Sequence, residues 1–214
     1  MSPGPLLVTG FEPFGGEPIN PAWEVVRGLE SSPPESGSVP LVIAQLPCNQ
    51  ASYVAAVDQV VARHEPSAVI AVGQATGRAR IALEARAVNR MRYGDAVDNG
   101  GHRDVDEALV EGGPTERPAT LPAEPLASEL AALGHAVEVS QDAGRFLCNA
   151  VLFHLLHRHA ATPALFVHLP LMPEQAERRA LGEASLPLED SDAAVRALVS
   201  LVARHVAHGL DARR

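Results

Sequence analysis

The chain has 214 residues, of which 46% are hydrophobic and 20% charged, and its formal net charge is −9. This length suits one domain, and the acidic balance, without any basic run, argues against a nucleic-acid partner. We expect no membrane span, because no segment approaches about 18 consecutive apolar residues. We also expect no secretory leader, because Met1–Pro5 lacks a basic segment. Two cysteines, Cys48 and Cys148, make neither a disulfide framework nor a paired zinc motif, which indicates a cytoplasmic protein.

Short apolar runs alternate with amphipathic stretches along the chain. Runs typical of buried strands lie at residues 6–10, 39–46, 68–73, 136–140 and 164–168. Helical periodicity occurs at residues 20–29, 49–64, 126–133, 148–159 and 191–208. Asn20 followed by Pro21 is a typical helix start, an N-cap and a first-turn proline. The alternation predicts an α/β fold: a single domain over residues 1–214, built as a three-layer α/β/α sandwich with a mixed, mostly parallel central sheet.

Three further segments have a less regular pattern. Residues 81–89 alternate weakly with a period of two, which predicts an edge or half-buried strand. Residues 93–125 show little periodicity and many charges, which is typical of a functional flap or a partly disordered excursion. Residues 31–38 are expected to form a surface linker. Loop residues cluster after the strands, at the sheet edge where α/β folds usually bind ligands.

Cys148 opens one of the predicted helices and follows a small, flexible Ala143-Gly144 approach. In a helix's first turn, the unpaired amides and the helix dipole favour an anion. The pKa of a thiol is commonly lowered in that setting, and the thiolate is the nucleophile. A lone cysteine is more often buried and inert, however, so a functional role for Cys148 requires partners.

The lengths of the helix that begins at Cys148 and of the strand that follows it indicate His168 as the first partner. Twelve helical residues at about 1.5 Å each span about 18 Å, and five or six strand residues at about 3.3 Å span a similar length. The chain therefore leaves one sheet edge through the helix at 148–159 and returns to it through the strand at 164–168. We expect Cys148 and His168 to be neighbours, with the imidazole acting as base and then as acid.

A third group would orient the imidazole, and spacing alone does not choose it. Glu84 is one candidate, an acid after the Gly73-Gln74 turn, although a solvated strand carboxylate is the commoner role for such a residue. The remaining histidines do not indicate a metal site. His157 and His159 face different sides of a helix, and His154 and His157, three apart, have no evident partner carboxylate. We therefore expect no metal.

Five segments taken in order make a specific pattern: Val8–Gly16 with Asn20-Pro21 and Trp23-Glu24; Val72–Ala75 with Gly77-Arg78; Glu84–Asn89 with Asp98-Asn99; Ala143-Gly144 to Cys148-Asn149; and His168–Pro170 with Pro173–Gln175. With this pattern the chain resembles the type I pyroglutamyl peptidases, also called pyrrolidone-carboxylate peptidases, over nearly its whole length. These enzymes are cysteine peptidases.

The resemblance implies a catalytic triad of Cys148 as nucleophile, His168 as base and acid, and Glu84 as the residue that orients His168. It also implies hydrolysis of an amino-terminal pyroglutamyl residue from peptides, through a thioester, without a cofactor. Its substrate pocket would have Phe14 and Phe146 on either side of the lactam ring. Other implied pocket residues are Phe11 beside the rings, Leu147 in the wall, Gln74 bonding the ring through its backbone, and Asn20 holding the loop. The family further suggests a homo-oligomer, a dimer or tetramer.

The chain departs from the family pattern at two places. The segment Arg90–Val97 appears one residue longer, so Arg90 or Arg92, or neither, takes the place of the family's arginine near the active site. Leu83 replaces a proline often found before the catalytic glutamate. Cys48 matches no catalytic position and is expected to be a packed strand residue. Two other interpretations remain open: another small thiol amidase on the same scaffold, and a non-enzymatic α/β ligand-binding protein.

Overall fold

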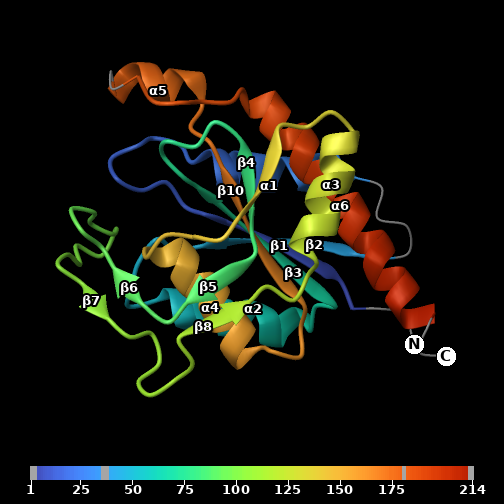
Figure 1. Cartoon of the computed structure of the whole chain (residues 1–214), viewed down its shortest axis with the longest axis horizontal. Helices are drawn as coiled ribbons and strands as arrows, with labels where there is room; N and C mark the ends of the chain where they lie inside the picture. The colour runs from blue at the N-terminus through green and yellow to red at the C-terminus, as the bar shows by residue number, and fades with distance from the viewer. Residues whose placement is uncertain (1–3, 35–38, 180–181, 212–214) are drawn as a thin grey trace.

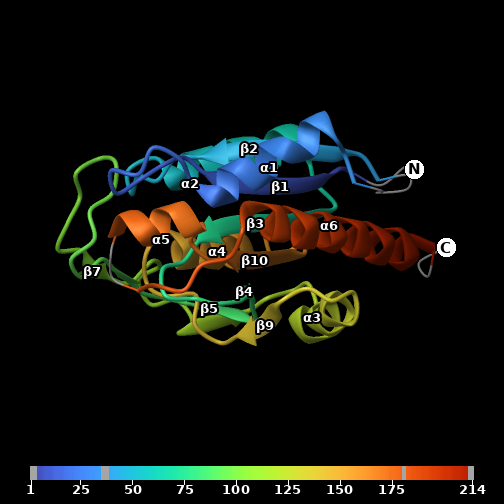
Figure 2. The same cartoon turned by 90° about the horizontal axis from the view of Figure 1, so that it is seen from above.

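A computed structural model describes residues 4–34, 39–179 and 182–211. Its centre is a six-stranded sheet in the order β2-β1-β3-β10-β4-β9, seen from β2 to β9 in Figure 2. The strands are β1 (Leu6–Phe11), β2 (Leu41–Leu46), β3 (Ala68–Gln74), β4 (Ile81–Glu84), β9 (Val137–Ser140) and β10 (Ala164–Leu169). Neighbouring strands are parallel except β10 and β4, which are antiparallel. The predicted mixed, mostly parallel sheet is therefore confirmed.

Helices cover both faces of this sheet, as the sandwich architecture requires. The helices are α1 (Pro21–Ser31), α2 (Tyr53–His64), α3 (Ala123–Ala132), α4 (Leu147–Arg158), α5 (Pro173–Arg179) and α6 (Leu188–Asp211). One apolar core joins α1, α3 and α6 to one face, and a second core joins α2 and α4 to the other. Figure 1 shows α3 and α6 on the opposite side of the strands from α2 and α4. No helix of the described ranges is long and apolar enough to cross a membrane.

Local sequence signals account for the helix that follows β1. The Asn20 side chain accepts a hydrogen bond from the Ala22 N–H at 3.0 Å, so Asn20 is the predicted N-cap of α1. Its amide also donates to the Glu12 carbonyl at 3.1 Å. This second bond ties the loop after β1 to the start of α1. Of the linker expected at residues 31–38, Ser31 belongs to α1, and residues 35–38 lie outside the described residues.

The prediction for residues 81–89 is wrong in two respects. The segment is two strands, because β5 (Arg86–Val88) leaves the main sheet and pairs with β8 (Glu116–Pro118). All four residues of β4 are buried, since β10 and β9 pair with its two edges and α3 lies over one face. The polar residue that suggested a half-exposed strand, Glu84, is itself fully buried.

Residues 93–122 form an excursion that has little regular structure but many specific contacts. A short ladder of β6 (Met91–Arg92) with β7 (Asp106–Glu107) begins it, and α3 ends it at Ala123, three residues before the predicted start. The buried Asp98 carboxylate accepts hydrogen bonds from the N–H groups of Gln50, Gly100 and His102. Burial would raise the pKa of Asp98, but the bonds from Gln50 and His102 outweigh it and lower that pKa. The ionised Asp98 carboxylate thus holds the excursion to the rest of the domain.

Asn149 fastens β5 to α4. Its side-chain oxygen accepts from the Val88 N–H at 2.8 Å, and its amide donates to the carbonyls of Val88 and Arg90, each at 2.9 Å. The side chain is almost fully buried, so water does not reach these backbone groups. The three hydrogen bonds from Asn149 satisfy them instead.

We expect Asn149→Ala to lower the free energy of unfolding by roughly 2–4 kcal/mol, because it leaves buried backbone groups of β5 without partners. Gln59→Ala, which removes an exposed amide from α2, should change it by less than about 0.5 kcal/mol. Urea denaturation of both variants checks this. Equal stabilities would show that water replaces Asn149 without cost.

Candidate active site

The first turn of α4 places the Cys148 thiol directly over β3. The chain enters through Gly144, whose φ of +75° lies in the left-handed region. At the crossing, Gly73 lacks the methyl group that would block contact. A Cβ there would lie 2.9 Å from Cys148 Sγ and 2.7 Å from Phe166 Cζ. Only glycine therefore allows the thiol to lie this close to the sheet.

His168 lies on the strand next to Gly73. The two residues are partners in the parallel pairing of β10 with β3, so their side-chain positions face the same way. His168 is 3% exposed and contacts Phe166, with 4.9 Å between ring centroids. Since Cys148 Sγ lies over Gly73, the structure brings the thiol and the imidazole to adjacent positions at the end of the sheet.

Glu84 reaches the same imidazole from the other side. It pairs with Phe166 across the antiparallel β4–β10 ladder, and its Oε1 is 2.7 Å from His168 Nδ1. With Nδ1–H donating to the carboxylate, the Nε2 lone pair of His168 is free to take a proton. Sequence analysis left open whether this acid is solvated; in the structure its side chain is 0% exposed.

Arg78 holds Glu84, and sequence analysis assigned it no role. Its guanidinium donates to Glu84 Oε1 at 2.9 Å and to the Asp142 carbonyl, also at 2.9 Å. Arg78 follows β3 in a turn, whereas Asp142 precedes α4, so their contact depends on the tertiary fold. No sequence spacing indicated this contact; the only signal was the presence of Arg78 in the family motif.

The environment of the Cys148 thiol raises its pKa, whereas the sequence predicted a lowered one. Burial and then the negative charge of Glu84 raise its pKa to about 12. The backbone N–H of Cys148 and the positive charge of Arg78 act in the opposite direction but are weaker. The prediction of a lowered pKa at the helix start was therefore wrong, because desolvation exceeds the effect of the helix amides. The thiol is neutral until a base removes its proton.

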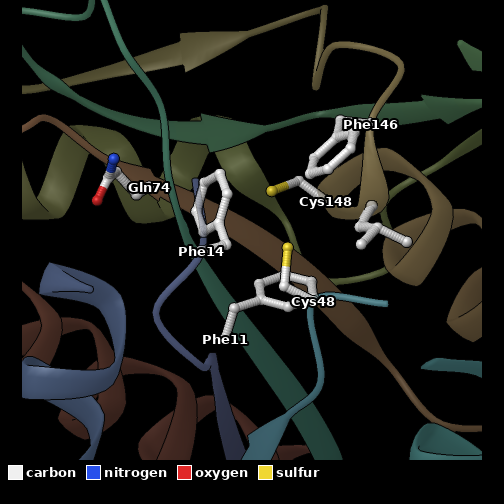
Figure 3. A pocket seen from close by; sticks show the side chains of 7 residues that line it. Phe11, Phe14, Cys48, Gln74, Phe146 and Cys148 are labelled. Atoms are coloured by element: carbon white, nitrogen blue, oxygen red, sulfur yellow. The ribbon is translucent and has the colours of Figure 1, made fainter. Parts of the chain in front are cut away.

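A narrow apolar pocket, with a free volume of about 10 Å³, opens beside the thiol. Its lining residues are Phe11, Phe14, Cys48, Gln74, Phe146, Leu147 and Cys148. Figure 3 shows the sulfur atoms of Cys48 and Cys148 directed into the space near Phe11, Phe14 and Phe146. The rings of Phe14 and Phe146 are 6.1 Å apart at their centroids and tilted by 34°. Of the residues expected at a substrate pocket, Asn20 is not in the lining and instead supports the loop through Glu12.

Two features, one in the pocket lining and one behind it, were not foreseen from the sequence. Cys48 is buried, as expected, but it follows β2 rather than lying in it, and it lines the pocket. Tyr93, from the excursion, packs edge-on against Phe146 with 4.5 Å between ring centroids. Its hydroxyl donates to Asp98 at 3.2 Å, so the Asp98 anchor also supports the pocket wall.

Neither arginine of the divergent segment lines this pocket. Arg90 pairs with Asp106 at 2.6 Å, and its side chain is half exposed. Arg92 is exposed, and its backbone N–H donates to the Arg145 carbonyl.

A thiol at a helix start, beside an imidazole held by a buried carboxylate, on an α/β/α sandwich, defines a cysteine-type hydrolase. Comparison with known proteins gives its family. The family model described as pyroglutamyl peptidase matches residues 5–205. A pyrrolidone-carboxylate peptidase of Cupriavidus taiwanensis is 42% identical over 86% of each chain. One of Chromobacterium violaceum is 43% identical over 92% of this chain and 91% of its own.

Solved structures agree with the sequence relatives. Pyroglutamyl peptidase I of Bacillus amyloliquefaciens superposes with a TM-score of 0.86 at 31% identity, over 95% of this chain and 98% of its own. A mutant pyrrolidone carboxyl peptidase of Pyrococcus furiosus gives 0.85 at 32% identity, over 94% and 98%. The chain belongs to the pyroglutamyl peptidase family.

We expect Gly73→Ala to lower the hydrolytic rate by about 10²-fold, because the added methyl displaces Cys148 Sγ from its place beside His168. The free energy of unfolding should fall by about 1–3 kcal/mol, as in other overpacked cores. The control is Gly28→Ala on α1, where a Cβ meets its nearest neighbour at 3.5 Å. Rate assays and urea denaturation check both variants. Full activity in Gly73→Ala would contradict the close approach of thiol and strand.

The raised pKa of Cys148, about 12, predicts how its alkylation depends on pH. The reactive thiolate forms only as pH rises toward that value, so the rate with iodoacetamide should increase about tenfold per pH unit from pH 7 to 10. Peptide mass mapping assigns the modified residue. A plateau within that range would instead indicate a preformed thiolate–imidazolium pair.

Proposed function

We propose that the chain hydrolyses the amino-terminal pyroglutamyl residue from peptides, with Cys148, His168 and Glu84 as its catalytic triad. The observation that carries the proposal is the apolar aromatic pocket that opens onto the Cys148 thiol, next to the 2.7 Å His168–Glu84 bond. The names of the relatives agree with this substrate.

The pocket lining suits a neutral lactam. Pyroglutamate has no free ammonium, and none of the residues that line the pocket is a carboxylate, arginine or histidine. Apolar walls with a few polar groups are what a small neutral ring requires. Phe14 and Phe146 would lie on either side of the ring. Because a ring stacked on both sides needs about 7 Å between its neighbours, these two rings would part by about 1 Å from their 6.1 Å separation.

Gln74 would provide the polar recognition of the ring. Its side-chain oxygen already accepts a hydrogen bond from Gln175 at 3.2 Å, and its backbone would bond the lactam, as the family resemblance implies. Phe11 and Leu147 would complete the apolar wall. Asn20 would keep the loop that carries Phe14 in place.

The reaction would begin with transfer of the Cys148 proton to His168 Nε2 as the sulfur attacks the pyroglutamyl carbonyl carbon. Glu84, bonded to Nδ1, would stabilise the imidazolium that forms. The oxyanion would lie at the start of α4, where the amides of Leu147, Cys148 and Asn149 precede the first intrahelical bond, Ala150 N–H to the Phe146 carbonyl at 3.2 Å.

The second half of the reaction would regenerate the thiol. His168 returns its proton to the leaving amine, so the shortened peptide departs and a pyroglutamyl thioester remains on Cys148. His168 then takes a proton from water, which attacks the thioester carbonyl. Release of pyroglutamate returns that proton to the sulfur. The chain's own residues supply every proton transfer, and the proposal needs no cofactor.

We also propose a cytoplasmic location and a homo-oligomer, a dimer or tetramer. The location is supported by two free cysteines, one of them the proposed nucleophile, which a reducing compartment keeps reduced. The assembly is supported by the family resemblance.

A pair of fluorogenic amides, pyroglutamyl and prolyl, tests the proposal. We expect cleavage of the pyroglutamyl amide only, and its loss in Cys148→Ala. Glu84→Gln should reduce kcat by about 10²–10⁴-fold with little change in the affinity for a substrate analogue, because it impairs orientation of His168 rather than the pocket.

Two outcomes would count against these assignments. Normal turnover by Cys148→Ala would remove the nucleophile, and a wild-type rate in Glu84→Gln would remove Glu84 from the triad. Cleavage of the prolyl amide at a similar rate would favour another thiol amidase on this scaffold.

A further inference from the structure

Asp58, His154 and His159 form a cluster at the end of α4 remote from Cys148. Asp58 projects from α2, His154 from α4, and His159 is the residue that caps α4. The Nε2 atoms of His154 and His159 lie 2.7 Å and 2.6 Å from the same oxygen, Asp58 Oδ1. All three donor atoms lie within 4.8 Å of one another. Since a helix rises about 1.5 Å per residue, His159 is about 16 Å along α4 from the thiol.

The sequence showed no evident carboxylate partner for His154 and His157; the structure places Asp58 beside His154, with His159 and not His157 as the second imidazole. His157 turns away and lies 3.1 Å from Arg117. His159 is five residues beyond His154, which on a regular helix is about 140° around the axis. As the C-cap, with φ −111° and ψ 38°, it leaves the helical path, and its ring returns to within 5.5 Å of the His154 ring.

Backbone hydrogen bonds and burial fix the two histidines of the cluster, in addition to their contacts with Asp58. The N–H of His159 donates to the Leu155 carbonyl at 3.0 Å, and its own carbonyl accepts from Thr162 at 2.8 Å. The side chains of His154 and His159 are only 16% and 19% exposed, whereas that of Asp58 is 41% exposed. Two fixed imidazoles therefore face a carboxylate that can still move toward solvent.

Two imidazole nitrogens and a carboxylate oxygen, with one side open to water, are a ligand set suited to Zn²⁺. Bonds of about 2.0 Å in a tetrahedral shell separate neighbouring ligand atoms by about 3.3 Å. The present Nε2–Oδ1 distances of 2.7 and 2.6 Å would then open by about 0.6 Å, within reach of a small rotation of the exposed Asp58 side chain. The ion would replace the two hydrogen bonds that the Asp58 carboxylate now accepts from the imidazoles.

We propose that Asp58, His154 and His159 bind one divalent transition-metal ion, with Zn²⁺ favoured by the ligand set and water in the remaining position. The ion joins α2 to α4 on the face of the sheet that also carries the thiol. It takes no part in the chemistry at Cys148. Its expected effect is on stability, because an ion that binds only the folded chain raises the unfolding temperature.

The test must separate this site from the thiols, which also bind Zn²⁺ and Co²⁺. We would use the full chain without an oligohistidine tag, in a Cys148→Ser background. Isothermal titration with Zn²⁺ should give one equivalent bound. Asp58→Asn and His159→Gln in that background should weaken binding by at least about tenfold, whereas the matched control His157→Gln, on the same helix but outside the cluster, should not.

Co²⁺ spectra and thermal unfolding give independent measurements. Co²⁺ should show visible ligand-field bands without a near-ultraviolet thiolate charge-transfer band, and those bands should vanish in Asp58→Asn. Saturating Zn²⁺ should raise Tm in the Cys148→Ser background and in the His157→Gln control, but not in Asp58→Asn or His159→Gln. Asp58→Asn with Cys148 intact should retain hydrolytic activity, which shows that it is folded.

Three results would overturn the proposal. They are no bound equivalent in the Cys148→Ser background, an affinity unchanged by both Asp58→Asn and His159→Gln, or a Co²⁺ spectrum dominated by a thiolate band. Failure of the metal site would leave the assignment of Cys148, His168 and Glu84 untouched, because the titration, the Co²⁺ spectra and the unfolding measurements do not depend on hydrolysis.

Discussion

The hydrogen bond between Glu84 and His168 is the interaction on which the arrangement of the site depends. It exists because β4 runs antiparallel to β10, which places Glu84 opposite Phe166 and within 2.7 Å of the His168 ring. A fully buried carboxylate is costly unless it is paired with a positive charge. The Arg78 guanidinium provides this pairing for Glu84, at 2.9 Å. The same charge helps to raise the pKa of Cys148, so it disfavours a resting thiolate. The geometry thus suits a nucleophile activated only when His168 takes its proton.

The motif from Gly144 to Asn149 combines four tasks within six residues. Gly144 turns the chain toward the sheet, Phe146 lines the pocket, and Cys148 lies over Gly73. Asn149 fixes the motif to β5 through three buried hydrogen bonds. A displacement of the helix start would therefore move the thiol and the pocket wall together. This coupling explains why the proposed nucleophile and the proposed specificity group are neighbours in the sequence.

Sequence reasoning succeeded where a signal was local and failed where partners were distant. The buried strands β1, β3 and β10 were predicted because their residues are continuously apolar, and the Asn20 cap because its residue types are specific. The adjacency of Cys148 and His168 followed from element lengths alone. The burial of Glu84, the role of Arg78 and the contact of Asp58 with His154 depend on segments far apart in the chain. The direction of the Cys148 pKa shift was missed because desolvation is a property of the packed site.

The excursion at residues 93–122 supports the pocket wall but carries none of the three proposed catalytic side chains. Its backbone has little regular structure, yet the Asp98 carboxylate holds it through hydrogen bonds from the N–H groups of Gln50 and His102. The Tyr93 hydroxyl also donates to Asp98, and the Tyr93 ring packs against Phe146. The thiol, imidazole and carboxylate instead lie on β4, β10 and α4, which belong to the packed sandwich. A substitution in the excursion can therefore alter the position of Phe146 without moving the His168–Glu84 bond. The Arg90–Val97 segment, which departs from the family pattern, overlaps the start of this excursion, so we expect its effect on the fit of the proposed substrate ring rather than on proton transfer.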